Sequence, residues 1–112
     1  MDEVREVRQY QLDGDFNGKR TAEMLQSTGS FLPRLRSVGL YVRAHVEDLN
    51  AWPRDVKLMA IGAQWVKPSG QILVPVYYRH PHFRHEIHVR RVDLDKTFTP
   101  NYHPLVSPPP AQ

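Results

Sequence analysis

Residues 71–94 combine an alternating apolar segment, a short turn and a returning segment, and no other feature constrains the fold as strongly. The first segment predicts a strand with one buried face, because apolar residues recur at every second position: Ile72, Val74, Val76 and Tyr78. Residues 80–84 (HPHFR) predict the turn, and residues 85–94 predict the returning strand. Pro75 has no N–H for a ladder hydrogen bond, so we expect an edge position or a bulge there. The stretch therefore predicts an antiparallel β-hairpin.

Two further strands are predicted before the hairpin. Residues 37–47 alternate between an apolar face and a polar face, as a half-buried antiparallel strand does. Residues 56–66 are apolar on both faces, which indicates a central strand. Residues 3–12 fit a strand and a helix about equally, and we favour a strand. Short connections between these segments favour antiparallel neighbours.

Residues 21–28 predict one short helix. Thr21 is a suitable N-cap, and Gly29 is a suitable stop at the C-terminal end. Met24 and Leu25 are expected to face the core. A helix this short requires tertiary contacts, so it must pack on the sheet.

The C-terminal residues 97–112 differ in composition from the rest of the chain. Five prolines occupy positions 100, 104, 108, 109 and 110, which predicts a segment that is neither a helix nor a central strand, but either an extended, polyproline-like arm or a disordered tail. Because the arm also carries Phe98, Leu105 and Val106, we expect it to lie along its own domain or along a neighbouring molecule. The predicted organisation is a single small domain over residues 1–96 and an arm over residues 97–112.

Together these segments predict an α+β fold: a four- to five-stranded antiparallel sheet, one short helix and the extended Pro-rich arm. A nearly all-β barrel or sandwich is the alternative. The chain has no cysteine, which excludes disulfides and thiolate metal sites. It has no apolar run of about eighteen residues and a charged N-terminus, so we expect a cytoplasmic protein, or one in a virion if the origin is viral.

The charge of the chain is unevenly distributed. Residues 1–32 carry four Lys/Arg and six Asp/Glu (net −2), residues 33–92 carry ten and four (net +6), and residues 93–112 carry one and two (net −1). A basic middle region favours acidic partners or phosphates.

The hairpin supplies the candidate binding residues. Its aromatic and basic side chains can contact a protein partner or stack on bases and pair with phosphates: Tyr77, Arg79, His82, Phe83, Arg84, Arg90 and Arg91. The Pro-rich arm and the hairpin together favour a non-catalytic binding or assembly protein, such as a virus- or phage-type structural or accessory subunit, which we expect to form a homo-oligomer or join a larger assembly. A nucleic-acid-binding sheet protein is the second hypothesis.

A histidine cluster in the turn supports a third hypothesis, a metal-dependent small-molecule enzyme. Its candidate ligands are His80, His82, His85 and Glu86, and imidazole with carboxylate suits Zn, Fe or Mn. The spacing His80-x-His82-x-x-x-Glu86 resembles the first metal motif of cupins over seven residues, although Val74 stands where that motif has glycine. No nucleophile elbow, phosphate-binding glycine loop or HExxH motif is present, so a non-catalytic protein is favoured over an enzyme, and we expect no cofactor.

Overall fold

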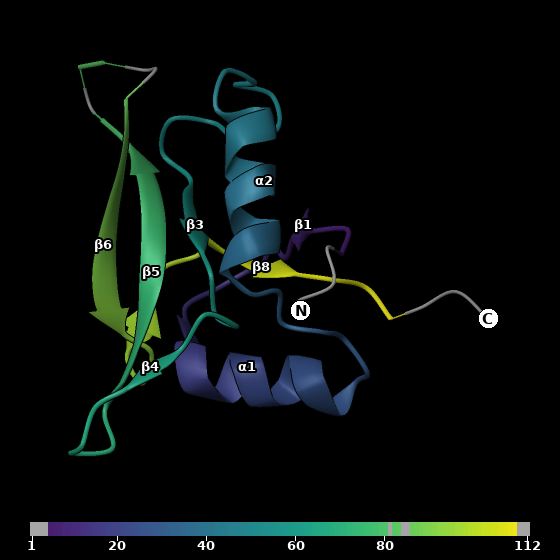
Figure 1. Ribbon diagram of the computed structural model, residues 1–112, viewed down its shortest axis with the longest axis vertical. Coiled ribbons are helices and arrows are strands. Elements are labelled where there is room, and N and C mark those ends of the chain that lie inside the picture. Colours follow the sequence, from purple (N-terminus) through teal and green to yellow (C-terminus); the bar gives the residue numbers. More distant parts are fainter. Residues whose placement is uncertain (1–4, 81, 84–85, 110–112) are drawn as a thin grey trace.

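The protein is built on a six-stranded sheet whose strands come from both ends of the chain (Figure 1). The computed structural model describes residues 5–80, 82–83 and 86–109. The sheet comprises β1 (Arg8–Gln9), β3 (Lys57–Met59), β4 (Trp65–Val66), β5 (Ile72–Arg79), β6 (Ile87–Asp93) and β8 (Tyr102–Val106). A separate two-stranded sheet pairs β2 (Phe16–Asn17) with β7 (Thr97–Phe98). The helices are α1 (Gly18–Ser27) and α2 (Leu35–His45).

The hairpin predicted over residues 71–94 is present. β5 and β6 pair in antiparallel register from Leu73 opposite Asp93 to Arg79 opposite Ile87. β3 and β4 both pair with β5, so they must occupy its other side, and β6 lies at the edge of the sheet.

Pro75 lies in an interior strand, whereas the sequence predicts an edge position or a bulge there. It is tolerated because β3 pairs with β5 on one side of this position and β4 pairs on the other, and neither pairs with Pro75 itself. Its carbonyl accepts a hydrogen bond from the N–H of Ala60, so its main-chain groups face the β3 side. The missing N–H therefore points to the gap between the end of β3 at Met59 and the start of β4 at Trp65. The segment 56–66, predicted as one central strand, is thus two short strands, of which β3 is interior.

Both faces of the sheet are buried, each in its own core. Adjacent residues of one strand belong to different cores, since side chains of a strand alternate between faces. Leu58 contacts the core that contains Val38, whereas Met59 contacts the core that contains Leu25. α2 covers one face and α1 covers the other; Figure 1 shows α2 upright beside the sheet and α1 crossing below it.

The first helix is where the sequence predicts one, but it is longer at the start. Asn17, not Thr21, is its N-cap: the side-chain oxygen accepts a hydrogen bond from the N–H of Arg20 at 3.0 Å. The helix ends before Gly29, whose φ of 89° suits a residue without Cβ. Leu25 faces the core as expected, whereas the prediction for Met24 is wrong, because that side chain is 38% exposed.

The prediction of a strand over residues 37–47 is wrong, since this segment forms α2. Val38 and Val42 are spaced so that they share a face in a strand and in a helix alike. The helix also brings Tyr41 onto that face, and all three side chains pack in the core with Trp52. Leu40, which a strand would bury, is 47% exposed. The lower helix propensity of valine amounts to tenths of a kcal/mol per residue, so tertiary packing overrides it.

The prediction that residues 97–112 contain no central strand is wrong for the described residues, because β8 is an interior strand. The segment lies along its own domain, which is one of the two placements expected from its apolar residues. β8 pairs in parallel with β3 and antiparallel with β1. Leu105 is fully buried. Pro104 accepts a hydrogen bond from the N–H of Tyr10, so its missing donor faces β1, where pairing is only two residues long. A proline is therefore accommodated in an interior strand beside a short neighbour.

The fold is mixed α+β, as predicted in class, but with two helices and a six-stranded sheet that is not purely antiparallel. The β3–β8 pair is its parallel element. Among the helices of the described residues, none is long and apolar enough to cross a bilayer.

Candidate functional site

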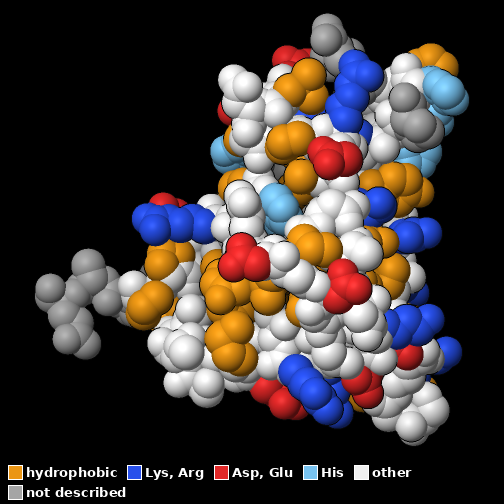
Figure 2. All heavy atoms as spheres, turned by 180° about the vertical axis from the view of Figure 1, so that it is seen from behind, with side chains coloured by type: hydrophobic (Ala, Val, Ile, Leu, Met, Phe, Trp, Pro, Cys, Tyr) orange, Lys and Arg blue, Asp and Glu red, His pale blue; other side chains and the backbone are white. Residues whose placement is uncertain are grey.

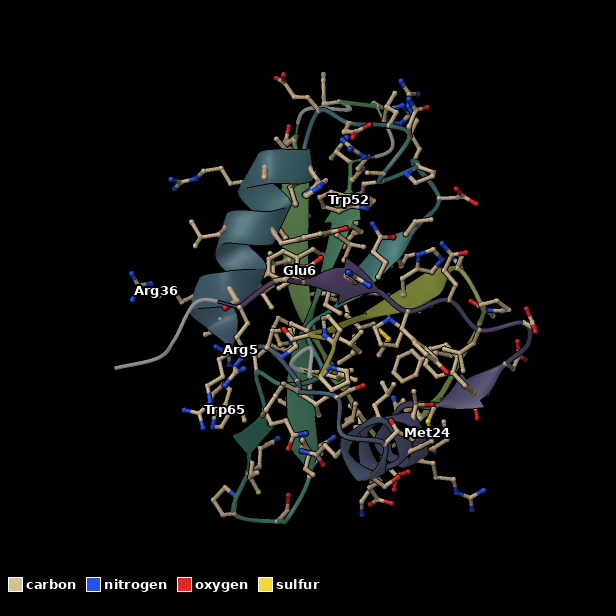
Figure 3. The ribbon with its side chains drawn as sticks, turned by 90° about the vertical axis from the view of Figure 1, so that its right-hand side faces the viewer. Arg5, Glu6, Met24, Arg36, Trp52 and Trp65 are labelled. Atoms are coloured by element: carbon tan, nitrogen blue, oxygen red, sulfur yellow. The ribbon has the colours of Figure 1, made fainter. Side chains whose placement is uncertain are left out.

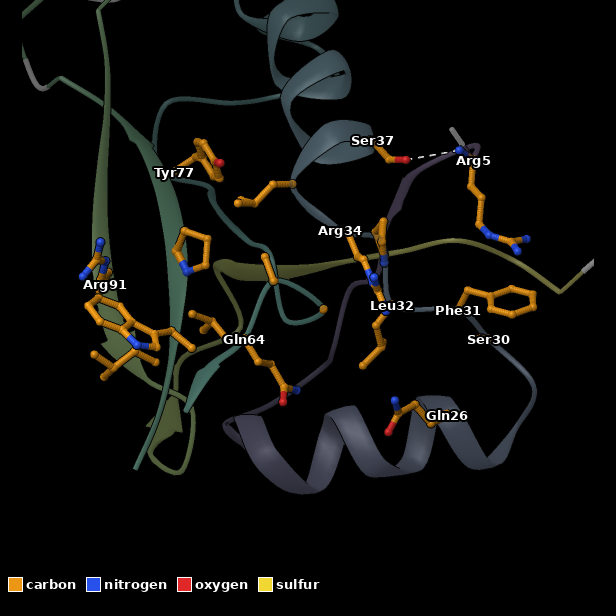
Figure 4. Close-up of a pocket in the computed structure, with 18 of the residues that line it drawn as sticks. Arg5, Gln26, Ser30, Phe31, Leu32, Arg34, Ser37, Gln64, Tyr77 and Arg91 are labelled. Carbon is orange, nitrogen blue, oxygen red and sulfur yellow. Dashed lines mark hydrogen bonds between the residues drawn. The ribbon is translucent and has the colours of Figure 1, made fainter. Parts of the chain in front are cut away.

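α2 leaves part of its face of the sheet uncovered, and this strip forms an open groove of about 1450 Å³ (Figure 4). We name it the Trp65 groove. Its lining includes Arg5, Gln26 of α1, residues 29–35 and 37 around the start of α2, residues 62–65 up to the start of β4, and side chains of β5 and β6. Figure 4 shows Arg91 on the strand side and Arg5 beside Phe31 on the opposite side.

The groove exposes large apolar side chains. Leu35 is 59% exposed, Trp65 is 52% exposed and Val89 is 52% exposed, although they come from α2, β4 and β6 respectively. Single exposed apolar residues are ordinary, but several that line one concavity indicate an interaction site. The guanidinium of Arg91 lies 3.9 Å from the centre of the Trp65 ring, which holds a cation over the exposed indole.

All charged residues in the described lining of the groove are basic. Arg5, Arg34 and Arg91 belong to its lining, and none of the described lining residues is Asp or Glu. Arg5 is anchored at the start of α2, because its N–H donates to Ser37 Oγ at 3.2 Å, and its guanidinium stacks 3.9 Å from the Phe31 ring centre. Figure 3 shows Arg5 and Trp65 on the same side of the molecule. The groove therefore favours an apolar ligand with negative charge.

Tyr77 joins the groove to the core beneath α2. It lies on β5, lines the groove and packs against the cluster around Trp52. Burial raises the pKa of its phenol, so the hydroxyl stays protonated at neutral pH. It offers a neutral hydroxyl to a ligand.

The hairpin residues proposed as a single binding surface are divided between the two faces of the sheet. Tyr77 and Arg91 lie in the groove. Arg90 lies on the other face, where its guanidinium is 5.8 Å from the Tyr78 ring centre and donates to the Tyr102 hydroxyl at 3.4 Å. Figure 2 shows Lys and Arg side chains gathered along the edge that the hairpin forms.

Arg79 is part of the fold and does not face a partner. It is 5% exposed, and its guanidinium lies 4.7 Å from the Trp52 ring centre. Its Nε donates to the Trp52 carbonyl at 3.1 Å, and its Nη2 donates to the His45 carbonyl at 3.4 Å. These bonds hold the end of β5 against the loop that follows α2.

The described part of the hairpin turn carries His80, His82 and an exposed aromatic ring. The Nδ1 atom of His80 accepts hydrogen bonds from the N–H groups of His82 and Phe83, at 3.1 and 3.3 Å. Phe83 is 62% exposed. His80 therefore stabilises the turn with the nitrogen that faces it. The predicted residues Arg84 and His85 lie outside the described residues.

The proposed metal ligands do not form a metal site within the described part of the hairpin. Glu86 pairs with His88, with 2.8 Å between Oε1 and Nε2. No three His, Asp or Glu side chains of the described residues are placed to hold a metal ion.

Several groove residues were not identified from the sequence. Leu35 is the first residue of α2. Because the sequence predicts a strand in this region, it does not indicate that Leu35 stands at the start of a helix. Trp65 was assigned to a buried central strand, although the turn at residues 67–70 follows it closely and signals a more exposed strand end. Arg5 reaches the groove through tertiary contacts that no local pattern indicates.

Comparison of the chain with protein-family models, with curated proteins and with solved structures finds no match. The function is therefore inferred from the geometry of the site.

Proposed function

We propose that the protein is a non-catalytic binding or assembly module that holds a protein partner in the Trp65 groove. The observation that carries this proposal is the exposure of Leu35, Trp65 and Val89 in one concavity. Aromatic and arginine side chains contribute most of the binding energy at protein interfaces, and Arg91 over Trp65 provides such a pair. A structural or accessory subunit of a larger assembly would need a surface of this kind.

The C-terminal segment has no part in this proposal. Because β8 is built into the sheet, residues 102–106 contribute to the core and are not available to reach another molecule. Contacts with a partner are instead assigned to the groove and to the strands of the hairpin that form its floor.

A peptide selection tests the proposal. A random peptide library displayed on phage is selected on the full chain, and the enriched peptides are measured against Trp65→Ser and Phe83→Ser. Both changes remove a large exposed aromatic side chain, 52% and 62% exposed, but only Trp65 lies in the groove. We expect converging peptides that lose at least about tenfold in affinity on Trp65→Ser and are unaffected by Phe83→Ser.

Tryptophan fluorescence locates the contact independently. The chain has two tryptophans, and Trp52 is fully buried, so we expect a shift in emission on binding to come from Trp65 and to be absent in Trp65→Ser. A library that yields no peptides, or peptides that bind Trp65→Ser as well as the original chain, would refute the proposal.

Nucleic-acid binding is a second candidate, and one observation favours it. On the face opposite the groove, Arg90 and Lys57 lie beside Tyr78 and Tyr102, with Lys57 Nζ 5.1 Å from the Tyr102 ring centre. Cations beside aromatic rings can contact phosphates and bases. In this case a single-stranded oligonucleotide binds with an affinity that falls steeply with salt and falls further on Arg90→Ala. Equal affinity for the variant would exclude this surface.

A further inference from the structure

The outer edge of β6 has main-chain groups that no described strand uses. β6 pairs only with β5 in the described part of the chain. The hydrogen bonds from His80 N to the Glu86 carbonyl and from Leu94 N to the Ile72 carbonyl show that even-numbered residues of β6 face β5. The N–H and C=O groups of the odd-numbered residues, including Val89, therefore point away from the sheet.

The same odd-numbered residues carry side chains on the groove side of the sheet. Ile87 packs against the core beneath α2, while Val89 and Arg91 line the Trp65 groove. The unpaired edge and the groove are therefore continuous. A strand added along β6 would place every second side chain on the groove face, next to Val89 and Arg91.

We propose that β6 binds an extended acidic peptide as an added antiparallel strand, whose alternate side chains enlarge the apolar floor of the Trp65 groove. This inference rests on the function proposed above and specifies its binding mode and its partner chemistry. Main-chain hydrogen bonds to the edge hold the peptide, and side chains on alternate positions select it.

The charges on β6 favour acidic residues in the peptide. Arg91 faces the groove and Arg90 faces the other side, so an acidic side chain on either face of the added strand meets an arginine. The acidic residues at the two ends of the edge already have partners: Glu86 pairs with His88, and Asp93 accepts a hydrogen bond from Gln71. An oppositely charged cross-strand pair is stabilising.

The same charges disfavour a second copy of this chain as the occupant in the registers that are centred on an arginine. A two-fold pairing of β6 with itself that is centred on Arg90 places that arginine opposite its own copy, and one centred on Arg91 does the same for Arg91. Like charges directly opposite one another destabilise a strand pair. Charged side chains on an edge strand also hinder edge-to-edge association.

Proline at position 89 provides the sharpest test. Because the Val89 N–H points outward, Val89→Pro removes a donor from the edge without removing a hydrogen bond to β5. Val89→Thr keeps the N–H and the branched shape, and is the matched control. Circular dichroism and thermal unfolding of both variants establish that the sheet is retained.

The probe is a fluorescein-labelled synthetic peptide of the same length as β6, seven residues. It carries glutamates opposite Arg90 and Arg91 and a valine opposite Val89. Fluorescence polarisation measures its affinity for the full chain and for each variant. We expect a loss of at least about tenfold on Val89→Pro and little change on Val89→Thr.

Two altered peptides make the test independent of whether Val89→Pro folds. A version N-methylated at the amides that face β6 keeps every side chain but lacks the main-chain donors, and we expect it to bind at least about tenfold more weakly. A version with lysine in place of glutamate is expected to bind more weakly to the original chain and more tightly to Arg91→Glu. Unchanged affinity for the N-methylated peptide would overturn strand addition, and equal affinity for the lysine peptide would overturn the acidic preference.

Other outcomes separate this inference from the proposed function. If Trp65→Ser abolishes peptide binding but Val89→Pro and N-methylation do not affect it, the groove binds a partner without strand addition, and this inference alone fails. If no variant affects peptide binding, both fail. A dimer in light scattering that is lost on Val89→Pro would show that a second copy of the chain occupies the edge. Displacement of the peptide by an oligonucleotide would show that the occupant is a nucleic acid. Either result would overturn the proposal that the occupant is an acidic peptide.

Discussion

Replacing Leu105 with alanine tests whether the C-terminal segment is part of the core. Leu105 is fully buried, and it packs in the cluster with Val38, Trp52 and Leu58. Burial of a leucine side chain stabilises a fold by about 1.5–3 kcal/mol, and the cavity left in its place raises the cost of Leu→Ala to about 2–5 kcal/mol. A domain of this size has a total stability of roughly 5–15 kcal/mol. The substitution should therefore remove about a third of the stability.

Urea unfolding followed by circular dichroism measures this loss. We expect the midpoint of unfolding of Leu105→Ala to fall by more than about 1 M urea, given a usual slope of about 1–3 kcal/mol per M. Leu40→Ala is the matched control, because Leu40 is 47% exposed on α2 and leucine and alanine have similar helix propensities. It should cost less than about 1 kcal/mol.

The difference between the two variants shows whether β8 is part of the core. If residues 97–109 were an arm outside the domain, Leu105→Ala would leave the free energy of unfolding unchanged. Equal midpoints for Leu105→Ala and Leu40→Ala would therefore refute the assignment of β8 as an interior strand.

Two further predictions concern pH and a close backbone approach. Burial lowers the pKa of His103 in the folded state, with Asp55 opposing the shift, so protonation of this histidine favours the unfolded chain. Its contribution to stability is fully present above about pH 6.5 and is lost as the pH falls below that value. The melting temperature of His103→Gln should therefore depend less on pH between 8 and 5 than that of the original chain. A Cβ on Gly62 would lie 2.4 Å from the carbonyl oxygen of Leu32, so Gly62→Ala should displace the groove wall and cost more than about 1 kcal/mol, whereas Gly14→Ala, with no atom within 4 Å, should be neutral in the same unfolding assay.

The parts of the fold that the sequence predicted are those that local interactions specify. The strand from residue 72, the turn at residues 67–70 and the returning strand follow from alternation and turn residues, and the turn closes with Gly70 N–H donating to the Lys67 carbonyl at 2.8 Å. The first helix was located because its end at Gly29 has a clear local signal.

The candidate site could not be predicted in the same way. The Trp65 groove depends on α2, whose Val38 and Val42 fit a strand as well as a helix until the partner surface is known. It brings together Arg5, Leu35, Trp65 and Val89, which are distant in sequence. Arg90 and Arg91, which the sequence predicts to belong to one binding surface, also lie on opposite faces of β6.

The sequence by itself determined the β5–β6 hairpin, the first helix, the absence of cysteine chemistry and the basic character of the middle region. Only the tertiary structure decided that residues 35–45 are helical, that a Pro-containing segment runs inside the sheet, and that β6 is left as an edge beside an open groove. The reason is that hydrogen bonding within a turn or helix is local. Burial of a face, by contrast, depends on which distant segment covers it. Pro104, for example, is accommodated only because the neighbouring strand β1 is short.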